Sequence, residues 1–130
     1  TGDETALTRA ITLLTEAGAR KVVRLPITIA AHSPLMASVA DEFAAAVDAA
    51  PLATARIPVV ANVTARPIAA PDEIRAELKA QLTSPVRWTD SIRYLGAQGV
   101  DSYVEVGPGD VLLGLVKRID RESRRVKFEL

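Results

Sequence analysis

His32 is the only histidine of this 130-residue chain, and histidine is the side chain best suited to acid–base chemistry near neutral pH. An apolar run over 27–31 leads up to it, and Ser33-Pro34 follows it directly. Ser is a preferred N-cap and Pro is favoured at the first helical position, so the sequence predicts His32 at the exit of a strand, just before a helix. Ligands bind at the carboxyl ends of strands in open α/β sheets. The positive end of a helix also favours neutral imidazole, the form that a general base needs.

The position of His32 leaves a second interpretation open, because a single histidine at a strand–helix junction is often only packed or solvated. The residue types that the sequence lacks exclude several other kinds of site. It contains no cysteine, which excludes a disulfide framework, a thiolate zinc site and a cysteine nucleophile. Since it contains one histidine, a multi-histidine metal site is excluded as well. We therefore expect no metal site and no resident cofactor.

The composition is that of an ordinary globular domain, with 48% hydrophobic and 25% charged residues. Sixteen basic residues balance sixteen acidic ones, which argues against a nucleic-acid partner bound by bulk charge. No apolar run reaches the length of a membrane span and no signal peptide opens the sequence, so we expect no membrane partner and a cytoplasmic location. The chain starts at Thr1 rather than at Met, which predicts a processed or truncated product.

Hydrophobic periodicity and end signals predict alternating helices and strands. Asp3 is a good N-cap and Gly18 a natural stop for the first helix, and the Ser-Pro pairs at 33–34 and 84–85 each mark a helix start. Pro26 lacks a ladder donor and interrupts the first strand. The expected elements are a helix over 4–17, a strand over 21–30, a helix over 34–49, a strand over 57–63, a loop over 65–71, helices over 72–82 and 85–98, a strand over 100–106, a helix from 110 and a last strand over 126–128.

Strands that alternate with helices favour an α/β layer architecture with a mostly parallel sheet. The nearly continuous apolar run over 57–63 is typical of a strand covered on both faces. The region 26–31 is the best candidate for a join between two subdomains.

Three further features are candidates for chemistry. Asn62 interrupts a buried strand, where an amide must be hydrogen-bonded, so it serves either the site or a turn. The turn at 107–109, Gly-Pro-Gly, resembles an anion cradle because helix N-termini present free N–H groups, although a tight structural turn is the commoner arrangement. A small basic end is either a solvated face or a contact for an acidic carrier protein or a nucleotide phosphate; it comprises Arg118, Arg121, Arg124 and Arg125.

Four segments together resemble one family. The segment A-H-S-P-L-M at 31–36 resembles the histidine motif of malonyl-CoA:acyl-carrier-protein transacylases and polyketide-synthase acyltransferase domains. The others follow in the family's order: I-P-V-V-A-N-V at 57–63, Q-L-T-S-P-V-R-W at 81–88 and E-V-G-P-G-D-V-L at 105–112. The run before the histidine fits as well, so the resemblance covers essentially the whole chain.

The resemblance implies a ping-pong acyl transfer. In the family, a serine in a G-H-S-x-G elbow takes malonyl from coenzyme A and gives it to the phosphopantetheine thiol of acyl carrier protein. The resemblance makes His32 the general base, makes the main-chain carbonyl of Gln81 the group that orients it, and matches Asn62 to the pocket lining. It implies malonyl-CoA and acyl carrier protein as partners in fatty acid or polyketide biosynthesis, with the coenzyme A thioester as substrate.

The sequence departs from the family in one large respect, because it contains no G-H-S-x-G. The family's nucleophile, its oxyanion donors and the arginine that pairs with the malonyl carboxylate all lie upstream of the matched part. The resemblance therefore implies a C-terminal portion, with 1–26 as the end of a ferredoxin-like small subdomain and 27–130 as the C-terminal part of the large hydrolase-like α/β domain. The missing N-terminal part of the enzyme is then a partner, and this chain alone is expected to be inactive.

Three alternatives stay open. The missing nucleophile favours a non-catalytic α/β fragment or carrier-protein docking module. Residues 29–31, Ile-Ala-Ala, match neither usual pattern for malonyl or methylmalonyl, and the small Ala31 leaves room for a branched extender in a polyketide-synthase acyltransferase. We prefer malonyl, because the chain ends soon after its last matched segment. A serine hydrolase of related fold is disfavoured by the lack of an Asp partner pattern.

Overall fold

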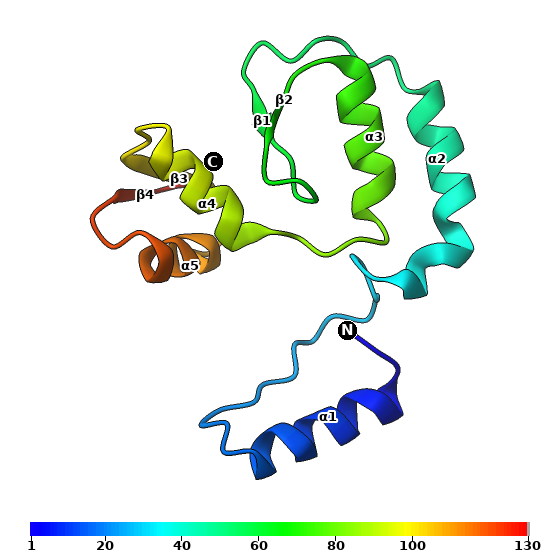
Figure 1. Cartoon of the computed structure of the whole chain (residues 1–130), viewed down its shortest axis with the longest axis vertical. Coiled ribbons are helices and arrows are strands. Elements are labelled where there is room, and N and C mark those ends of the chain that lie inside the picture. The colour runs from blue at the N-terminus through cyan, green and yellow to red at the C-terminus, as the bar shows by residue number, and fades with distance from the viewer. Residues whose placement is uncertain (130) are drawn as a thin grey trace. The chain divides into compact units, whose positions relative to one another are not determined.

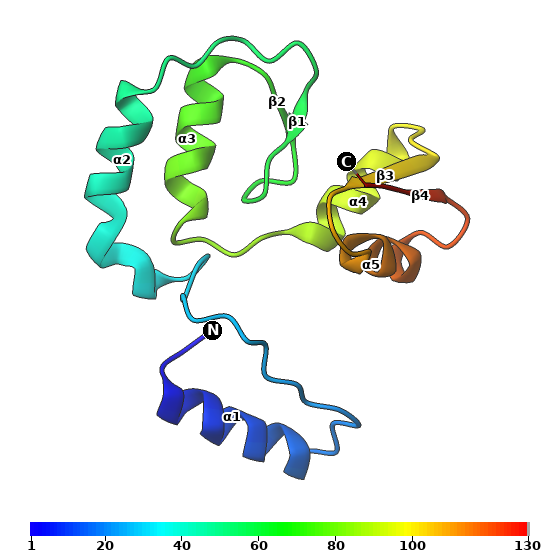
Figure 2. The same cartoon turned by 180° about the vertical axis from the view of Figure 1, so that it is seen from behind.

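A computed structural model describes residues 1–129 of the chain (Figures 1 and 2). These residues form helices and short strands in two compact units. The first unit comprises Thr1–Pro51 and Leu78–Pro85, and the second comprises Leu52–Glu77 and the described residues from Val86 onward. The predicted mixed helix-and-sheet class with parallel strands is confirmed.

The first unit begins with helix α1, Glu4–Glu16, close to the predicted range. Asp3 caps the helix as predicted, because its carboxylate accepts the N–H of Ala6 at 2.8 Å. Gly18 follows the helix at φ +87°, in the left-handed region that glycine adopts without strain. Both predicted end signals are therefore confirmed.

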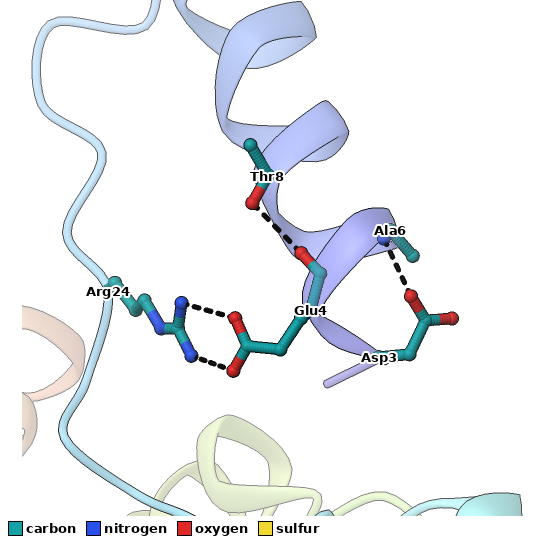
Figure 3. Close-up of polar contacts among 5 residues, drawn as sticks. All are labelled: Asp3, Glu4, Ala6, Thr8 and Arg24. Carbon is teal, nitrogen blue, oxygen red and sulfur yellow. Dashed lines mark hydrogen bonds and ion pairs between the residues drawn. The ribbon is translucent and has the colours of Figure 1, made fainter.

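An ion pair fastens the segment after α1 to the helix. Arg24 and Glu4 form a bidentate pair, in which Nη1 of Arg24 lies 2.6 Å from Oε2 of Glu4 (Figure 3). The guanidinium lowers the pKa of the Glu4 carboxyl, first through this hydrogen bond and then through its charge. Both side chains are exposed, so the pair contributes little stability.

The strand predicted over 21–30 is wrong, because the segment forms no regular strand. Extended backbone becomes a strand only when a neighbour supplies ladder hydrogen bonds, and within residues 1–129 nothing pairs with it. Its alternating apolar side chains consequently stay 60–64% exposed; they are Val23, Leu25, Ile27 and Ile29.

The predicted helix after His32 consists of two pieces. A 3₁₀ helix, η1, spans Pro34–Val39, and α2 spans Ala40–Ala49. The predicted start is confirmed, because Ser33 is the N-cap and Pro34 occupies the first turn. Val47 is the buried residue of α2, so the helix supplies only a small part of a core.

The second unit contains a strand–helix–strand arrangement. Strand β3, Ser102–Val106, pairs in parallel with β4, Arg124–Phe128, and Val104 lies opposite Val126. Helix α5, Val111–Ile119, connects the two strands and contacts both (Figures 1 and 2). Parallel neighbours need a crossover of this kind, and the predicted order of elements is confirmed here.

A two-stranded hairpin replaces the predicted buried strand. Strands β1, Val59–Val60, and β2, Pro67–Ile68, pair antiparallel. The prediction of a strand over 57–63 covered on both faces is wrong, because Val59 is 51% exposed and the ladder is two residues long. Strand β2 also lies within the predicted loop.

Helix α4, Trp88–Ala97, begins three residues later than the second Ser-Pro pair predicts. The main-chain N–H of Arg87 donates to the carbonyl of Asn62 at 2.8 Å and so ties the chain to the hairpin before the helix starts. A tertiary hydrogen bond therefore overrides the local capping signal. The predicted end is confirmed, since Gly99 follows the helix at φ +84°.

Helix α3, Pro71–Gln81, starts one residue before the predicted Asp72. Its first turn carries Glu73, whose carboxylate accepts the N–H groups of Ala69 at 3.1 Å and of Ala70 at 3.0 Å. These two bonds cap the helix and lower the pKa of Glu73. The opposite end of the same helix presents Gln81.

We expect the Glu73 cap to make a pH-dependent contribution to stability. The pKa of Glu73 is lower in the folded state than its ordinary value of 4.5, which applies in the unfolded state. The contribution is therefore complete above that value and is lost as the pH falls through the folded-state pKa. Glu73→Gln should lower the urea midpoint of unfolding at pH 7, and the difference should shrink as the pH approaches 3. An equal difference at both pH values would contradict the cap.

Few side chains are buried in the described part of the chain. The apolar ones are Val47 in the first unit and Ala61, Ala65, Ile92 and Val116 in the second. Many large apolar side chains are exposed in both units. None of the helices over residues 1–129 combines the length and the apolar character that crossing a membrane requires.

Candidate active site

His32 occupies a sharp kink of the first unit. Its φ is +60°, in the left-handed region that costs a residue with a Cβ about 1–2 kcal/mol. Ser33 next to it is fully extended, at φ −148° and ψ 162°, which suits a residue that precedes proline. A conformation of this kind persists only where other bonds hold it, and such strain is concentrated at functional sites.

Two consecutive carbonyls hold His32 in place. Its main-chain N–H donates to the carbonyl oxygen of Leu82 at 3.0 Å, and its ring Nδ1 lies 2.7 Å from the carbonyl oxygen of Gln81. A carbonyl oxygen can only accept, so Nδ1 carries the proton of this bond. In the neutral ring, Nε2 then has the free lone pair, which makes Nε2 the atom that can accept a proton. The side chain is exposed, so this atom is reachable.

The two carbonyls belong to the carboxyl end of α3. Gln81 is the last residue of the helix, and the last carbonyls of a helix have no partner within it. They also lie at the negative end of the helix dipole. An ion pair between Nζ of Lys79 and Oδ1 of Asp48, at 2.5 Å, joins the last turn of α3 to α2. The helix end that contacts His32 is thus a carboxyl end, rather than the N-terminus on which the sequence argument relied.

Asn62 lies in the second unit, at the start of the turn over 62–64. Its carbonyl accepts the N–H of Arg87, and the next N–H, that of Val63, donates to Oε1 of Glu77 at 3.0 Å. Asn62 therefore takes part in fixing a turn. Its role in lining a substrate pocket stays a prediction.

The Gly-Pro-Gly turn at 107–109 is a structural turn. Both glycines have positive φ, +131° at Gly107 and +86° at Gly109. The N–H groups at the start of α5 are taken within the chain, because the Glu105 carboxylate accepts those of Leu112 at 3.2 Å and Leu113 at 2.9 Å. The anion-cradle interpretation of this turn is therefore replaced by an internal cap.

Removing the Glu105 carboxylate should destabilise the second unit. Glu105→Ala leaves two helix N–H groups without their acceptor, and loss of a helix cap costs about 1–2 kcal/mol. We expect a corresponding fall in the free energy of unfolding measured with urea. Glu105→Gln keeps one acceptor oxygen and should lose less. Equal unfolding curves for Glu105→Ala and the parent would contradict the cap.

The basic end divides into one structural arginine and three exposed ones. Nη1 of Arg125 donates to three carbonyl oxygens, among them that of Ser123 at 2.6 Å, and is therefore committed to the turn before β4. The exposed members are Arg118, Arg121 and Arg124.

Sequence reasoning missed a shallow hollow of about 690 Å³ in the second unit. Three arginines and a tyrosine line much of it, from the hairpin, from the residue just before α4 and from α4 itself. His32, Gln81 and Asn62 do not contribute to the lining. Its lining comprises Thr64, Ala65, Arg66, Pro67, Arg87, Asp90, Arg93 and Tyr94. The lining residues fall in two stretches, 64–67 and 87–94, and no periodicity or motif in the sequence predicts that these stretches lie together. Residues 1–129 also contain no cluster of three or more acidic or histidine side chains that could hold a metal ion.

Comparisons with known proteins agree on one group. No family model matches the chain. The malonyl CoA-acyl carrier protein transacylase of Escherichia coli is 41% identical over 118 residues, which are 91% of this chain and 38% of that protein. The crystal structure of the Xanthomonas oryzae malonyl-CoA:acyl carrier protein transacylase superposes with a TM-score of 0.91 at 40% identity, over 97% of this chain and 40% of that one. A malonyl-transacylase solved in complex with its type II polyketide acyl-carrier protein gives 0.90 at 33% identity, over 99% and 41%.

By sequence and by fold, the chain is therefore similar to part of the acyltransferases that these comparisons name. Within that class it is similar to the malonyl CoA-acyl carrier protein transacylases, and the resemblance carried by its four motifs is confirmed. The chain spans about two fifths of the length of these relatives, which fits the predicted C-terminal portion.

Proposed function

We propose that the intact protein transfers a malonyl group from coenzyme A to the phosphopantetheine thiol of acyl carrier protein, through an acyl-serine intermediate. The observation that supports this most directly is the 2.7 Å contact between Nδ1 of His32 and the Gln81 carbonyl oxygen. It leaves Nε2 free to accept a proton, as a general base for a nucleophile must.

In this proposal His32 acts in both half-reactions. Nε2 accepts the proton of the serine hydroxyl while the serine oxygen attacks the thioester carbonyl, and it returns that proton to the sulfur of the departing coenzyme A. It then accepts the thiol proton of the carrier's phosphopantetheine, whose sulfur attacks the acyl-serine, and returns it to the serine oxygen. Gln81 positions the ring through its carbonyl and stabilises the positive charge that the ring carries between transfers.

The remaining parts of the reaction are assigned to other segments. The serine comes from a part of the intact protein outside this chain, whose sequence has no G-H-S-x-G. Asn62 lines the substrate pocket, and no cofactor is needed besides the coenzyme A thioester that is the substrate. Residues 1–26 end a ferredoxin-like subdomain and 27–130 belong to the large α/β domain. We place the reaction in the cytoplasm, where coenzyme A thioesters are made and used.

Mass spectrometry of the intact protein before and after addition of malonyl-CoA tests the proposal. We expect one malonyl group on the protein, and its transfer to holo acyl carrier protein when the carrier is added. The apo carrier, which lacks the thiol, is the matched control and should receive none. An intact protein that is never acylated would contradict the proposal.

A second candidate applies to the 130 residues taken alone, since they contain a base without its nucleophile motif. In that case the chain is a non-catalytic docking module for the carrier protein. Binding of holo carrier to the isolated chain, without acylation of either, would favour this candidate. Absence of both binding and acylation would exclude it.

A further inference from the structure

The hydroxyl of Ser33 spans the kink at which His32 lies. It donates to the carbonyl oxygen of Ala30 at 2.7 Å, and it accepts the main-chain N–H of Leu35 at 3.3 Å. One oxygen therefore connects the residue two positions before His32 with the residue three positions after it. The main-chain oxygen of Ser33 accepts the N–H of Met36 at 3.1 Å and starts the 3₁₀ helix.

The kink needs support of this kind because His32 is held in a left-handed conformation, at φ +60°. His32 bonds to Gln81 through its ring and to Leu82 through its main-chain N–H. Both groups of His32 must therefore face the end of α3 at the same time. If the kink relaxes to an ordinary extended backbone, these two groups no longer face the same helix end. The contacts of Ser33 close the kink from both sides and are independent of α3.

We infer that Ser33 is a positioning residue for His32, whose hydroxyl keeps the imidazole ring on the Gln81 carbonyl. Ser33 itself makes no step of the reaction, because its hydroxyl proton is committed to Ala30 and its oxygen to Leu35. The inference rests on the proposed function, since it assigns a support to the base of that reaction.

The experiment compares three variants of the intact protein with the parent. Ser33→Ala removes both bonds, and Ser33→Thr keeps a hydroxyl at the same carbon. Ser84→Ala is the matched control, because it removes the hydroxyl from the chain's other Ser-Pro pair. The measurements are kcat and KM for malonyl transfer to carrier protein, the melting temperature, and the proton–nitrogen NMR signal of Nδ1 of His32, assigned by its loss in His32→Ala.

We expect Ser33→Ala to lower kcat by about 10- to 100-fold, as small misplacements of a reacting group do, with KM changed less than threefold. Its Nδ1 signal should shift or broaden, because the bond to Gln81 is no longer held. Ser33→Thr should restore most of kcat and the parent signal, and Ser84→Ala should match the parent in both.

Other outcomes overturn the inference. If Ser33→Ala keeps the kcat and the Nδ1 signal of the parent, Ser33 does not position His32. The same holds for a lower melting temperature with an unchanged kcat, which would leave Ser33 a merely structural cap. The inference is also overturned if the kcat of Ser33→Thr falls as far as that of Ser33→Ala. These results are distinct from failure of the proposed function, in which His32→Ala would keep full transfer activity.

Discussion

Replacing His32 in the intact protein is expected to lower kcat for malonyl transfer by about 10²–10⁴-fold, the range that loss of a general base costs. Nδ1 is bonded to the Gln81 carbonyl oxygen at 2.7 Å, so Nε2 is the atom that takes the proton, and no substitution at this position supplies an equivalent base. The loss should appear in kcat more than in KM, because the base acts in the transition state.

Two substitutions separate this chemical loss from a structural one. Alanine at position 32 adds strain, since φ is +60°, whereas asparagine tolerates the left-handed region and cannot act as the base. His32→Ala and His32→Asn should lose the same activity, while His32→Asn should keep the higher melting temperature. If His32→Asn transfers malonyl at the parent rate, His32 is not the base and the packed or solvated interpretation is correct.

The sequence was sufficient to single out His32 and the local signals around it. Ser33 and Pro34 predicted a helix start, and the structure contains it. The reason is that capping is a local interaction, made between residues only a few positions apart. The same pair at 84–85 predicted a helix that begins only at Trp88, because the N–H of Arg87 bonds to Asn62 instead. A local signal fails where a bond from a distant part of the chain takes its place.

Two of the strand predictions, over 21–30 and over 57–63, failed for a different physical reason, whereas the strands predicted over 100–106 and 126–128 are present as β3 and β4. The alternation over 21–30 predicts an extended segment with one apolar side, but pairing depends on a neighbour that periodicity does not identify. Without that neighbour among the described residues, side chains such as Leu25 and Ile27 are more than 60% exposed. The hairpin at 59–60 and 67–68 also depends on its pairing partner. The strand predicted over 57–63 is shortened to two residues because its ladder contains only two residue pairs.

The contact between His32 and Gln81 joins residues 49 positions apart, and no pattern in the residues themselves predicted it. Only the family resemblance placed the two together. The structure supplies a physical account, because the last carbonyls of a helix, here one that ends at Gln81, are not used by hydrogen bonds within the helix. Because the contact is made by the main-chain carbonyl, it depends on where the helix ends and little on which side chain stands at position 81.

Two substitutions at position 81 should therefore have very different effects. Gln81→Ala keeps the main-chain carbonyl, and we expect it to lose less than about threefold in kcat. Gln81→Pro removes an N–H from the last turn of α3 and sets a ring against the carbonyl of Glu77, at a cost of about 3 kcal/mol or more in stability. We expect kcat to fall on the order of 10²-fold, because the carbonyl that holds Nδ1 of His32 is displaced.

The control for lost stability is Ile92→Ala in the second unit, where a side chain only 3% exposed is truncated at a comparable cost of about 2–5 kcal/mol. Assayed below its melting temperature, Ile92→Ala should keep the parent kcat, while Gln81→Pro should not. A similar fall in the kcat of both variants would mean that the loss of stability alone lowers activity. A large loss in Gln81→Ala would mean that the side chain of Gln81, rather than the end of its helix, acts on the site. If a helix carbonyl orients the base, neither result should be found.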